Sequence, residues 1–264
     1  MIIDGGALAA RLYAELKNEV SHMKQVPHLT VFTCAPNFET QKYLRLKKRK
    51  AQEVGVGVSI VELPDSLTTE EMVQSVTHAC LQTDGIIVQL PLPAHIDTDK
   101  VLEAIPAQYD VDGMHYDGTA NSIVSPVVAA IALIAEQNDI LLAAQQVVVV
   151  GQGRLVGKPA ALWAKGQGAC VSVLTKESED VMSKIATADI LILGAGDAHM
   201  VLPEMVKDGV VIFDAATSED GGELVGDAHP DCAQKASLMT PVPGGIGPIT
   251  VAMLLKNLIE RVSH

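Results

Sequence analysis

Short aliphatic runs alternate with amphipathic helical patterns from residue 29 onward. The runs LTVFTC (29–34), VSIVEL (58–63) and GIIVQL (85–90) are rich in β-branched residues, which is typical of buried strands. The segments between them, residues 41–54 and about 68–81, are predicted to be helices because apolar positions recur with helical spacing. This alternation predicts a parallel sheet with right-handed crossovers.

A second series of the same kind begins at residue 146. Helical segments, including a short one near residues 203–207, separate further aliphatic runs, which are QVVVVG (146–151), CVSVL (170–174), DILILG (189–194) and GVVIFD (209–214). The sequence therefore predicts two α/β units in tandem.

Two more helices are predicted around the second series. Residues 125–137 begin with Ser125 before Pro126, a favourable N-cap followed by a favourable first-turn residue. Residues 249–262 have an amphipathic pattern and are expected to form the last helix.

Composition and charge restrict the class of protein. The 264 residues carry a net charge of −13, which disfavours a nucleic-acid partner because such proteins present broad basic surfaces. Hydrophobic residues make up 48% of the chain and aromatic residues only 3%, so aliphatic cores are expected. No apolar run approaches the roughly 18 residues that span a bilayer. We expect a soluble, cytoplasmic protein that does not bind membranes.

No metal site or disulfide framework is predicted. The cysteines are widely scattered and form no CxxC pair, so they are interpreted as reduced, mostly buried thiols: Cys34, Cys80, Cys170 and Cys232. Several histidines without metal-ligand spacing are interpreted as surface or loop residues: His95, His115, His199 and His229.

A glycine-rich segment follows the first strand of the second series. Gly151, Gly153 and Gly157 lie between this strand and a helix, where free N–H groups and the helix dipole favour a pyrophosphate. The third glycine falls one position later than in GxGxxG, so the motif is a variant. A tight turn without a ligand is the alternative interpretation.

The choice between NAD and NADP depends on the residues after the second strand of this series. An acidic residue there would bind ribose hydroxyls, whereas a cation would meet a 2′-phosphate. The segment LTKESED (174–180) offers both, with Lys176 next to Glu177, and Arg154 adds a second cation. The sequence leaves both cofactors open.

The segment KYLRLKKRK (42–50) is strongly basic although the chain is acidic. Tyr43 and Lys47 are four residues apart and share one face of the predicted helix. A lysine buried beside an aromatic ring can lose its proton near neutral pH, which would make it a usable acid/base. A solvated basic helix face is the alternative.

Three further strings give the chain a recognisable order of motifs. They are VQLPLP (88–93), YDVDGMH (109–115) and TPVPGG (240–245). Together with Tyr43 and Lys47, they resemble the methylenetetrahydrofolate dehydrogenase/cyclohydrolase family over nearly the whole chain.

The resemblance implies an α/β enzyme of two domains with folate in the cleft between them. Residues 1–138 and 249–264 would form the folate-binding catalytic domain, a parallel sheet completed by the C-terminal helix. Residues 139–248 would form a Rossmann-like dinucleotide-binding domain. The family resemblance also implies a homodimer that works in one-carbon metabolism and supplies purine biosynthesis.

The resemblance also implies roles for individual residues. Lys47 would be the central catalytic group, Gln89 would tune its basicity, Tyr43 would stack on the aminobenzoate ring and Asp112 would anchor the pterin. Other residues would line the substrate site, namely Leu90, Pro243, Gly244 and Gly245. The cofactor would contact Gly151, Gln152, Gly153, Arg154, Val156, Gly157, Thr175 and Lys176.

The implied activity has two steps. A nicotinamide cofactor, NADP or NAD, would oxidise 5,10-methylenetetrahydrofolate to the 5,10-methenyl form, and hydrolysis would give 10-formyltetrahydrofolate. Gln152 and Gly153 replace the Arg-Ser that many members carry, so an arginine used for the 2′-phosphate is missing.

Other interpretations stay open at this level. A catalytically weak relative could act as a sensor or interaction protein, and another Rossmann dehydrogenase could act on amino or hydroxy acids. Lys48, Arg49 and Lys50 could bind the glutamate tail of folate or could be solvated.

Overall fold

The computed structural model describes residues 1–119 and 121–263, which form two compact units. One unit contains a five-stranded sheet and consists of Met1–Ala9, Tyr116–Thr119 and Val124–Thr250. The other contains a three-stranded sheet and includes residues 10–115, 121–123 and 251–263. They are called the five-stranded unit and the three-stranded unit below.

The three predicted strands of the first series form one parallel sheet. Strands β1 (His28–Cys34), β2 (Gly57–Leu63) and β3 (Gly85–Val88) are arranged in the order β2-β1-β3. The two predicted helices are α2 (Phe38–Val54) and α3 (Thr69–Ala79). The β-α-β-α-β prediction is therefore confirmed.

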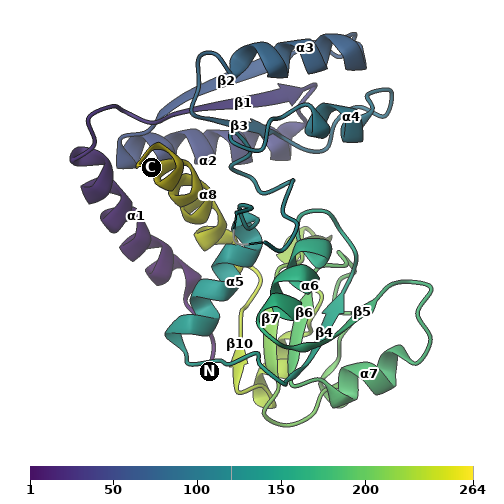
Figure 1. Cartoon of the computed structure of the whole chain (residues 1–264). Helices are drawn as coiled ribbons and strands as arrows, with labels where there is room; N and C mark the ends of the chain where they lie inside the picture. The colour runs from purple at the N-terminus through teal and green to yellow at the C-terminus, as the bar shows by residue number, and fades with distance from the viewer. Residues whose placement is uncertain (120, 264) are drawn as a thin grey trace. The chain divides into compact units, whose positions relative to one another are not determined.

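Different helices cover the two faces of this sheet (Figure 1). Phe32, Ile86 and Val88 contact α3 and α4 (Thr98–Glu103). Val31 and Ile87 on the opposite face pack with residues of α1 (Gly5–Ser21), α2 and α8 (Ile246–Ser263). The C-terminal helix thus completes the core of the three-stranded unit, as the sequence predicted.

Local capping residues set the bounds of α2 and α3. Asn37 accepts a hydrogen bond from the Thr40 N–H, so α2 begins at Phe38, earlier than the predicted Gln41. Thr68 and Glu71 form a reciprocal capping box at the start of α3. The C-cap Gly55 ends α2 with φ +94°, a conformation that favours glycine.

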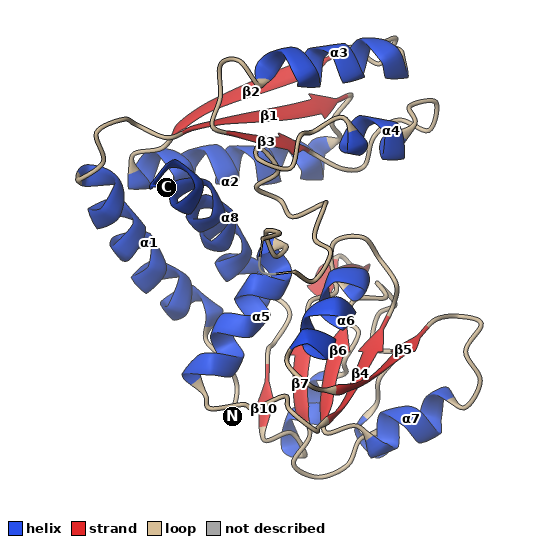
Figure 2. Cartoon of the chain, in the orientation of Figure 1, coloured by secondary structure: helices blue, strands red, loops and turns tan. Residues whose placement is uncertain are grey.

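The five-stranded unit has a parallel sheet in the order β10-β7-β6-β4-β5 (Figure 2). Its strands are β4 (Gln146–Val150), β5 (Cys170–Leu174), β6 (Ile190–Leu193), β7 (Val211–Asp214) and β10 (Leu238–Met239). Starting at β4, the chain adds β5 on one side and then β6 on the other, which is the strand reversal typical of doubly wound nucleotide-binding folds.

Helices and short 3₁₀ segments connect these strands. The helices are α5 (Pro126–Gln137), α6 (Gly157–Gly166) and α7 (Val181–Thr187), with 3₁₀ turns at Pro203–Met205 and Pro230–Gln234. Ser125 caps α5 by accepting from the Val128 N–H, as predicted. Helix α6 packs on β4, β5 and β6.

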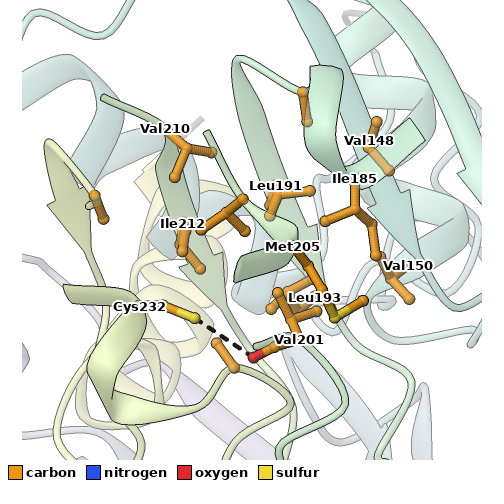
Figure 3. Close-up of a cluster of buried hydrophobic side chains, with 14 of the residues drawn as sticks. Val148, Val150, Ile185, Leu191, Leu193, Val201, Met205, Val210, Ile212 and Cys232 are labelled. Carbon is orange, nitrogen blue, oxygen red and sulfur yellow. Dashed lines mark hydrogen bonds between the residues drawn. The ribbon is translucent and has the colours of Figure 1, made fainter. Parts of the chain in front are cut away.

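The core of the five-stranded unit is aliphatic, as the composition predicted (Figure 3). Alternate residues of β4, β6 and β7 point to one face, where Ile185 of α7 and Met205 cover them. The Cys232 thiol is buried in this cluster and donates to the Val201 carbonyl at 3.4 Å.

Several elements were not predicted from the sequence. They are α1, α4, β10 and an antiparallel hairpin of β8 (Ser218–Asp220) and β9 (Glu223–Val225). These elements are short or follow irregular apolar patterns, and β10 consists of only Leu238 and Met239. Among the described residues, no helix combines the length and apolar character needed to cross a membrane.

The bounds of the two compact units differ from those of the predicted domains. Helix α5 and residues 1–9 fall in the five-stranded unit, where Ser125 bonds to the Leu155 carbonyl and Ile3 donates to the Met239 carbonyl. Compact units and functional domains need not coincide, so the domain boundaries 1–138, 139–248 and 249–264 stay predictions. His264 lies outside the described residues.

Candidate active site

Lys47 lies on α2 with its side chain inside the three-stranded unit. Only 7% of its surface is exposed, although its neighbours Lys48 and Arg49 are exposed. Its Nζ donates to Gln89 Oε1 at 3.0 Å and lies 4.7 Å from the centre of the Tyr43 ring. The prediction that Tyr43 and Lys47 share a face is confirmed, and the solvated alternative for Lys47 is excluded.

Gln89 follows the last residue of β3 and is held in a defined orientation. Its backbone N–H donates to the Phe32 carbonyl, which extends the pairing of β3 with β1 by one residue. Its side-chain Nε2 donates to the Leu90 carbonyl at 2.9 Å. Because the amide nitrogen is used there, the amide oxygen faces the Lys47 amine.

Asp112 lies close enough to Lys47 for each charge to affect the other. Burial lowers the pKa of Lys47, and the Asp112 carboxylate opposes that shift. Burial raises the pKa of Asp112, which the Lys47 charge lowers and the Asp110 charge raises further. Burial thus weakens the preference of both side chains for their charged forms, which is the property that acid/base chemistry requires.

Asp110 and His115 form a pair beside this site that the sequence analysis missed. Asp110 is 2% exposed, and its Oδ2 accepts from the His115 backbone N–H at 2.8 Å and contacts Nδ1 at 3.0 Å. His115 is an exposed turn residue, as predicted, but the sequence did not indicate its carboxylate partner. Its spacing of five residues from Asp110, across Gly113, was the available signal for a closed turn.

The Tyr43 hydroxyl stays protonated in this setting. Burial raises its pKa well above the usual range, and the charge of Asp112 and the nearby Tyr13 add to the shift. The Lys50 Nζ lies 4.9 Å from the centre of the Tyr13 ring, on α1. Burial, together with the Glu53 charge, raises the pKa of Tyr13 to about 12.

Two cations of the basic segment already have an acidic partner. Lys50 donates to Glu53 at 2.7 Å, and the Arg49 guanidinium lies 3.7 Å from the same carboxylate. This pairing favours the interpretation that Arg49 and Lys50 offset local acidity over the one that assigns them to a folate tail.

The glycine loop of the five-stranded unit has the close backbone packing of a pyrophosphate cradle. Gly151 has φ +99°, and a Cβ there would come within 2.6 Å of the Gly194 carbonyl oxygen. A Cβ on Gly157 would collide with the Gly151 carbonyl group. Helix α6 begins at Gly157, and no side chain caps its first N–H groups.

Other residues predicted to hold the cofactor surround this loop. Gln152, Gly153 and Arg154 are exposed, whereas Val156 packs on the Gly194 backbone. After β5, the Thr175 N–H donates to Ser178 Oγ at 2.9 Å and the Thr175 hydroxyl accepts from the Glu177 N–H. Lys176 is exposed in the same turn.

The TPVPGG segment also belongs to the five-stranded unit. Thr240 is fully buried, and its hydroxyl accepts from the Asp214 N–H at 2.7 Å and donates to the Asp214 carbonyl at 3.2 Å. The Gly245 N–H donates to the Pro241 carbonyl, which closes the turn and leaves Pro243 and Gly244 exposed.

Two family models together match most of the chain. Residues 3–112 match the tetrahydrofolate dehydrogenase/cyclohydrolase catalytic domain, and residues 125–264 match the NAD(P)-binding domain of the same family. The chain belongs to the tetrahydrofolate dehydrogenase/cyclohydrolase family. The resemblance inferred from the sequence motifs is thus confirmed.

Curated members of this family resemble the chain over its full length. It is 35% identical to the bifunctional protein FolD of Nautilia profundicola and 36% identical to that of Lactococcus lactis subsp. lactis. Each match covers 100% of this chain and 97% of the relative.

Solved structures of the family have the same fold. The FolD methylenetetrahydrofolate dehydrogenase/cyclohydrolase of Campylobacter jejuni matches with a TM-score of 0.96 and 31% identity, over 100% of this chain and 98% of that one. The Trypanosoma brucei enzyme, complexed with NADP and an inhibitor, matches with a TM-score of 0.92 and 31% identity, over 100% and 97%. The predicted two-domain α/β fold with parallel sheets is confirmed.

Proposed function

We propose that this family member oxidises 5,10-methylenetetrahydrofolate to the 5,10-methenyl form with NADP, and then hydrolyses that product to 10-formyltetrahydrofolate. The observation that carries the proposal is the Lys47 amine, buried between the Gln89 amide and the Tyr43 ring, in a chain whose two halves match the two domains of the family.

Lys47 is the proton carrier of the hydrolytic step. Its lowered pKa makes the neutral amine available, so it takes a proton from the water that attacks the methenyl carbon. The ammonium then gives this proton to N5 as the bond between N5 and the one-carbon unit breaks, and the hydroxyl proton leaves to solvent as the formyl group forms. The step releases one proton overall, as hydrolysis of a cation to a neutral product requires.

Gln89 and Tyr43 set the position of the Lys47 amine. The Gln89 amide oxygen accepts one N–H of Lys47, which fixes the direction of the remaining N–H bonds or lone pair. The Tyr43 ring offers an apolar, uncharged face on which an aminobenzoate ring can stack, because its hydroxyl keeps its proton. Leu90 belongs to the same strand end and would contact the substrate.

Asp112 is assigned to recognition of the pterin. A carboxylate accepts hydrogen bonds from the donor-rich amino-pyrimidine edge, and it balances the positive charge of the methenyl cation and of protonated Lys47. Its raised pKa reflects burial without such donors, so a pterin would stabilise the ionised form.

The glycine loop fits a dinucleotide. The Gly151, Gly153 and Gly157 backbone and the start of α6 would hold the pyrophosphate, and Thr175, Lys176 and Arg154 would face the ribose. NADP, when bound, accepts the hydride of the oxidative step. NADP is preferred to NAD because the Trypanosoma brucei relative is complexed with NADP and because Lys176 and Arg154 are exposed cations.

We further infer a cytoplasmic homodimer that takes tetrahydrofolate derivatives as its substrates, as the resemblance implies. Light scattering after size-exclusion chromatography should give twice the mass of one chain. A monomer at micromolar concentration would refute the dimer and leave the activity unaffected.

The activity is tested by following methenyltetrahydrofolate absorbance with NADP and NAD side by side. We expect turnover with NADP, followed by loss of the methenyl signal as hydrolysis proceeds. Binding of folate and NADP without turnover in either step would refute the enzyme and favour the sensor interpretation.

A further inference from the structure

Two carboxylates are almost completely buried at the carboxyl edge of the five-stranded sheet. Asp214 ends β7 and is 1% exposed, and Asp227 follows the β8-β9 hairpin and is 0% exposed. Both use their carboxylate oxygens to accept backbone N–H groups. Buried acids of this kind are costly unless each oxygen is satisfied.

Asp227 binds the loop that follows β6. Its Oδ2 accepts from the Ala195 N–H at 2.7 Å, and its Oδ1 accepts from the Asp197 N–H at 2.8 Å. Burial raises the pKa of Asp227, and hydrogen bonds from the backbone of Ala195, Asp197 and the intervening Gly196 oppose this shift. One side chain thereby fixes three successive backbone groups of residues 194–197, called the β6 exit loop below.

The β6 exit loop forms one wall of the glycine cradle. The Gly194 carbonyl lies so close to Gly151 that a Cβ on Gly151 would come within 2.6 Å of it. A Cβ on Gly194 would in turn come within 2.6 Å of the side chain of Val156, which precedes α6. A displacement of the exit loop would therefore move the backbone that surrounds a bound dinucleotide.

Asp214 holds the neighbouring loops at the same edge. Its Oδ1 accepts from the Ala216 N–H at 3.1 Å, and its Oδ2 accepts from the Ala228 N–H at 2.8 Å, one residue after Asp227. The Asp214 backbone also forms two hydrogen bonds with the hydroxyl of Thr240, the first residue of the TPVPGG segment. Asp214 thus supports the chain segment that carries Asp227.

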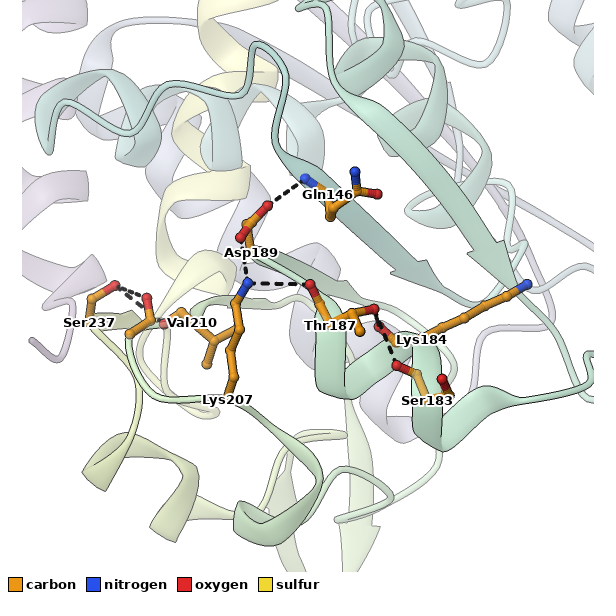
Figure 4. Close-up of polar contacts among 9 residues, drawn as sticks. Gln146, Ser183, Lys184, Thr187, Asp189, Lys207, Val210 and Ser237 are labelled. Carbon is orange, nitrogen blue, oxygen red and sulfur yellow. Dashed lines mark hydrogen bonds and ion pairs between the residues drawn. The ribbon is translucent and has the colours of Figure 1, made fainter.

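A third acid of the sheet provides a natural comparison (Figure 4). Asp189 precedes β6 and accepts from the Gln146 N–H at 2.7 Å, at the amino edge of the same strands. It is also paired with Lys207 and is partly exposed. It resembles Asp227 in accepting a backbone N–H between strands but lies at the edge away from the glycine loop.

We propose that Asp227 is a positioning residue for the dinucleotide, acting by holding the β6 exit loop in the conformation that the glycine cradle requires. The proposal rests on the proposed function in one respect, because it takes NADP as the ligand of the cradle. Asp227 itself does not react, and it acts through Ala195, Gly196 and Asp197.

The test is Asp227→Asn, with NADPH as the probe. Asparagine keeps one acceptor oxygen and turns its NH₂ group toward an N–H donor of the exit loop, so at least one hydrogen bond to that loop is lost. We expect the Kd for NADPH, measured by fluorescence, to rise on the order of tenfold. Hydrolysis of methenyltetrahydrofolate, which needs no dinucleotide, should stay near the wild-type rate. Asp189→Asn should leave the NADPH Kd unchanged.

Hydrogen exchange supplies a readout that does not depend on activity. Without cofactor, the amides of Ala195 and Asp197 should exchange faster in Asp227→Asn than in the wild type, and those of β4 should not change. If Asp227→Asn does not fold, Gly196→Ala is the second variant. Gly196 has φ +72°, a backbone conformation that a side chain disfavours, so alanine strains the loop there. The added Cβ meets open space, so it causes no clash of its own. This variant should raise the NADPH Kd in the same direction.

The inference about Asp227 would be overturned if Asp227→Asn bound NADPH with the wild-type Kd, or if Gly196→Ala did so when Asp227→Asn does not fold. The proposed oxidation would be unaffected by that result. Equal weakening of NADPH binding by Asp189→Asn would also overturn the inference about Asp227, since the effect would then be general. Absence of NADPH binding by the wild type would overturn the proposed oxidation and this inference with it.

Discussion

Replacement of Lys47 by methionine separates the chemistry of the amine from its packing. Methionine keeps a long unbranched side chain at a position that is 7% exposed, so the core volume changes little. The amine and its hydrogen bond to Gln89 Oε1 are lost. General acid/base groups contribute about 10²–10⁴-fold to rates. We therefore expect cyclohydrolase activity to fall at least about 100-fold, to the level of the uncatalysed reaction if no other group carries the proton.

The same substitution has opposing effects on stability. Leaving the Gln89 amide oxygen unpaired costs about 1–3 kcal/mol. In the other direction, Lys47 has a folded-state pKa below its ordinary value of 10.5, so between these two values the folded state binds fewer protons than the unfolded state. Stability then rises with pH across that window. Lys47→Met removes this contribution, so its free energy of unfolding should depend less on pH below 10.5.

The assay follows the loss of methenyltetrahydrofolate absorbance, corrected for the uncatalysed rate. Urea unfolding at several pH values gives the stability, and NADPH fluorescence confirms that the nucleotide site is intact. Lys48→Met is the matched control because Lys48 is exposed on the same helix. A Lys47→Met variant that hydrolyses at the wild-type rate would remove Lys47 from the mechanism.

Three further predictions use the same assays. Gln89→Ala leaves the Lys47 amine without its acceptor, so the cyclohydrolase rate should fall about tenfold and its pH profile should move; an unchanged profile would exclude tuning by Gln89. Gly157→Ala places a Cβ against the Gly151 carbonyl group, so NADPH binding should be lost while hydrolysis persists; retained binding would contradict the cradle. Burial raises the pKa of Asp214 from 3.8 to about 6, so the folded state binds the proton more tightly and loses about 3 kcal/mol as pH rises through that window. In urea unfolding, Asp214→Asn should not lose this stability as pH rises. A free energy of unfolding that depends on pH equally in the wild type and the variant would refute the raised pKa.

The sequence alone was sufficient wherever a function depends on local order. Except for the two-residue β10, the strands of the two sheets follow from aliphatic runs, because a strand buried on both faces must be apolar at successive positions. The glycine loop follows from its place between a strand and a helix, since the pyrophosphate contacts are made by neighbouring backbone groups. The motif strings around Gln89, Asp112 and Thr240 identified the family, which the comparisons confirmed.

The tertiary structure decided which of the charged residues are buried and with what partners. Spacing put Tyr43 and Lys47 on one helix face, but Lys47 is buried because the end of β3 places Gln89 above that face, 42 residues away in the chain. Asp110 with His115, and Asp227 with the β6 exit loop, likewise depend on folding. A side chain's local pattern fixes its direction, whereas the desolvation that shifts its pKa comes from segments that only folding brings to it.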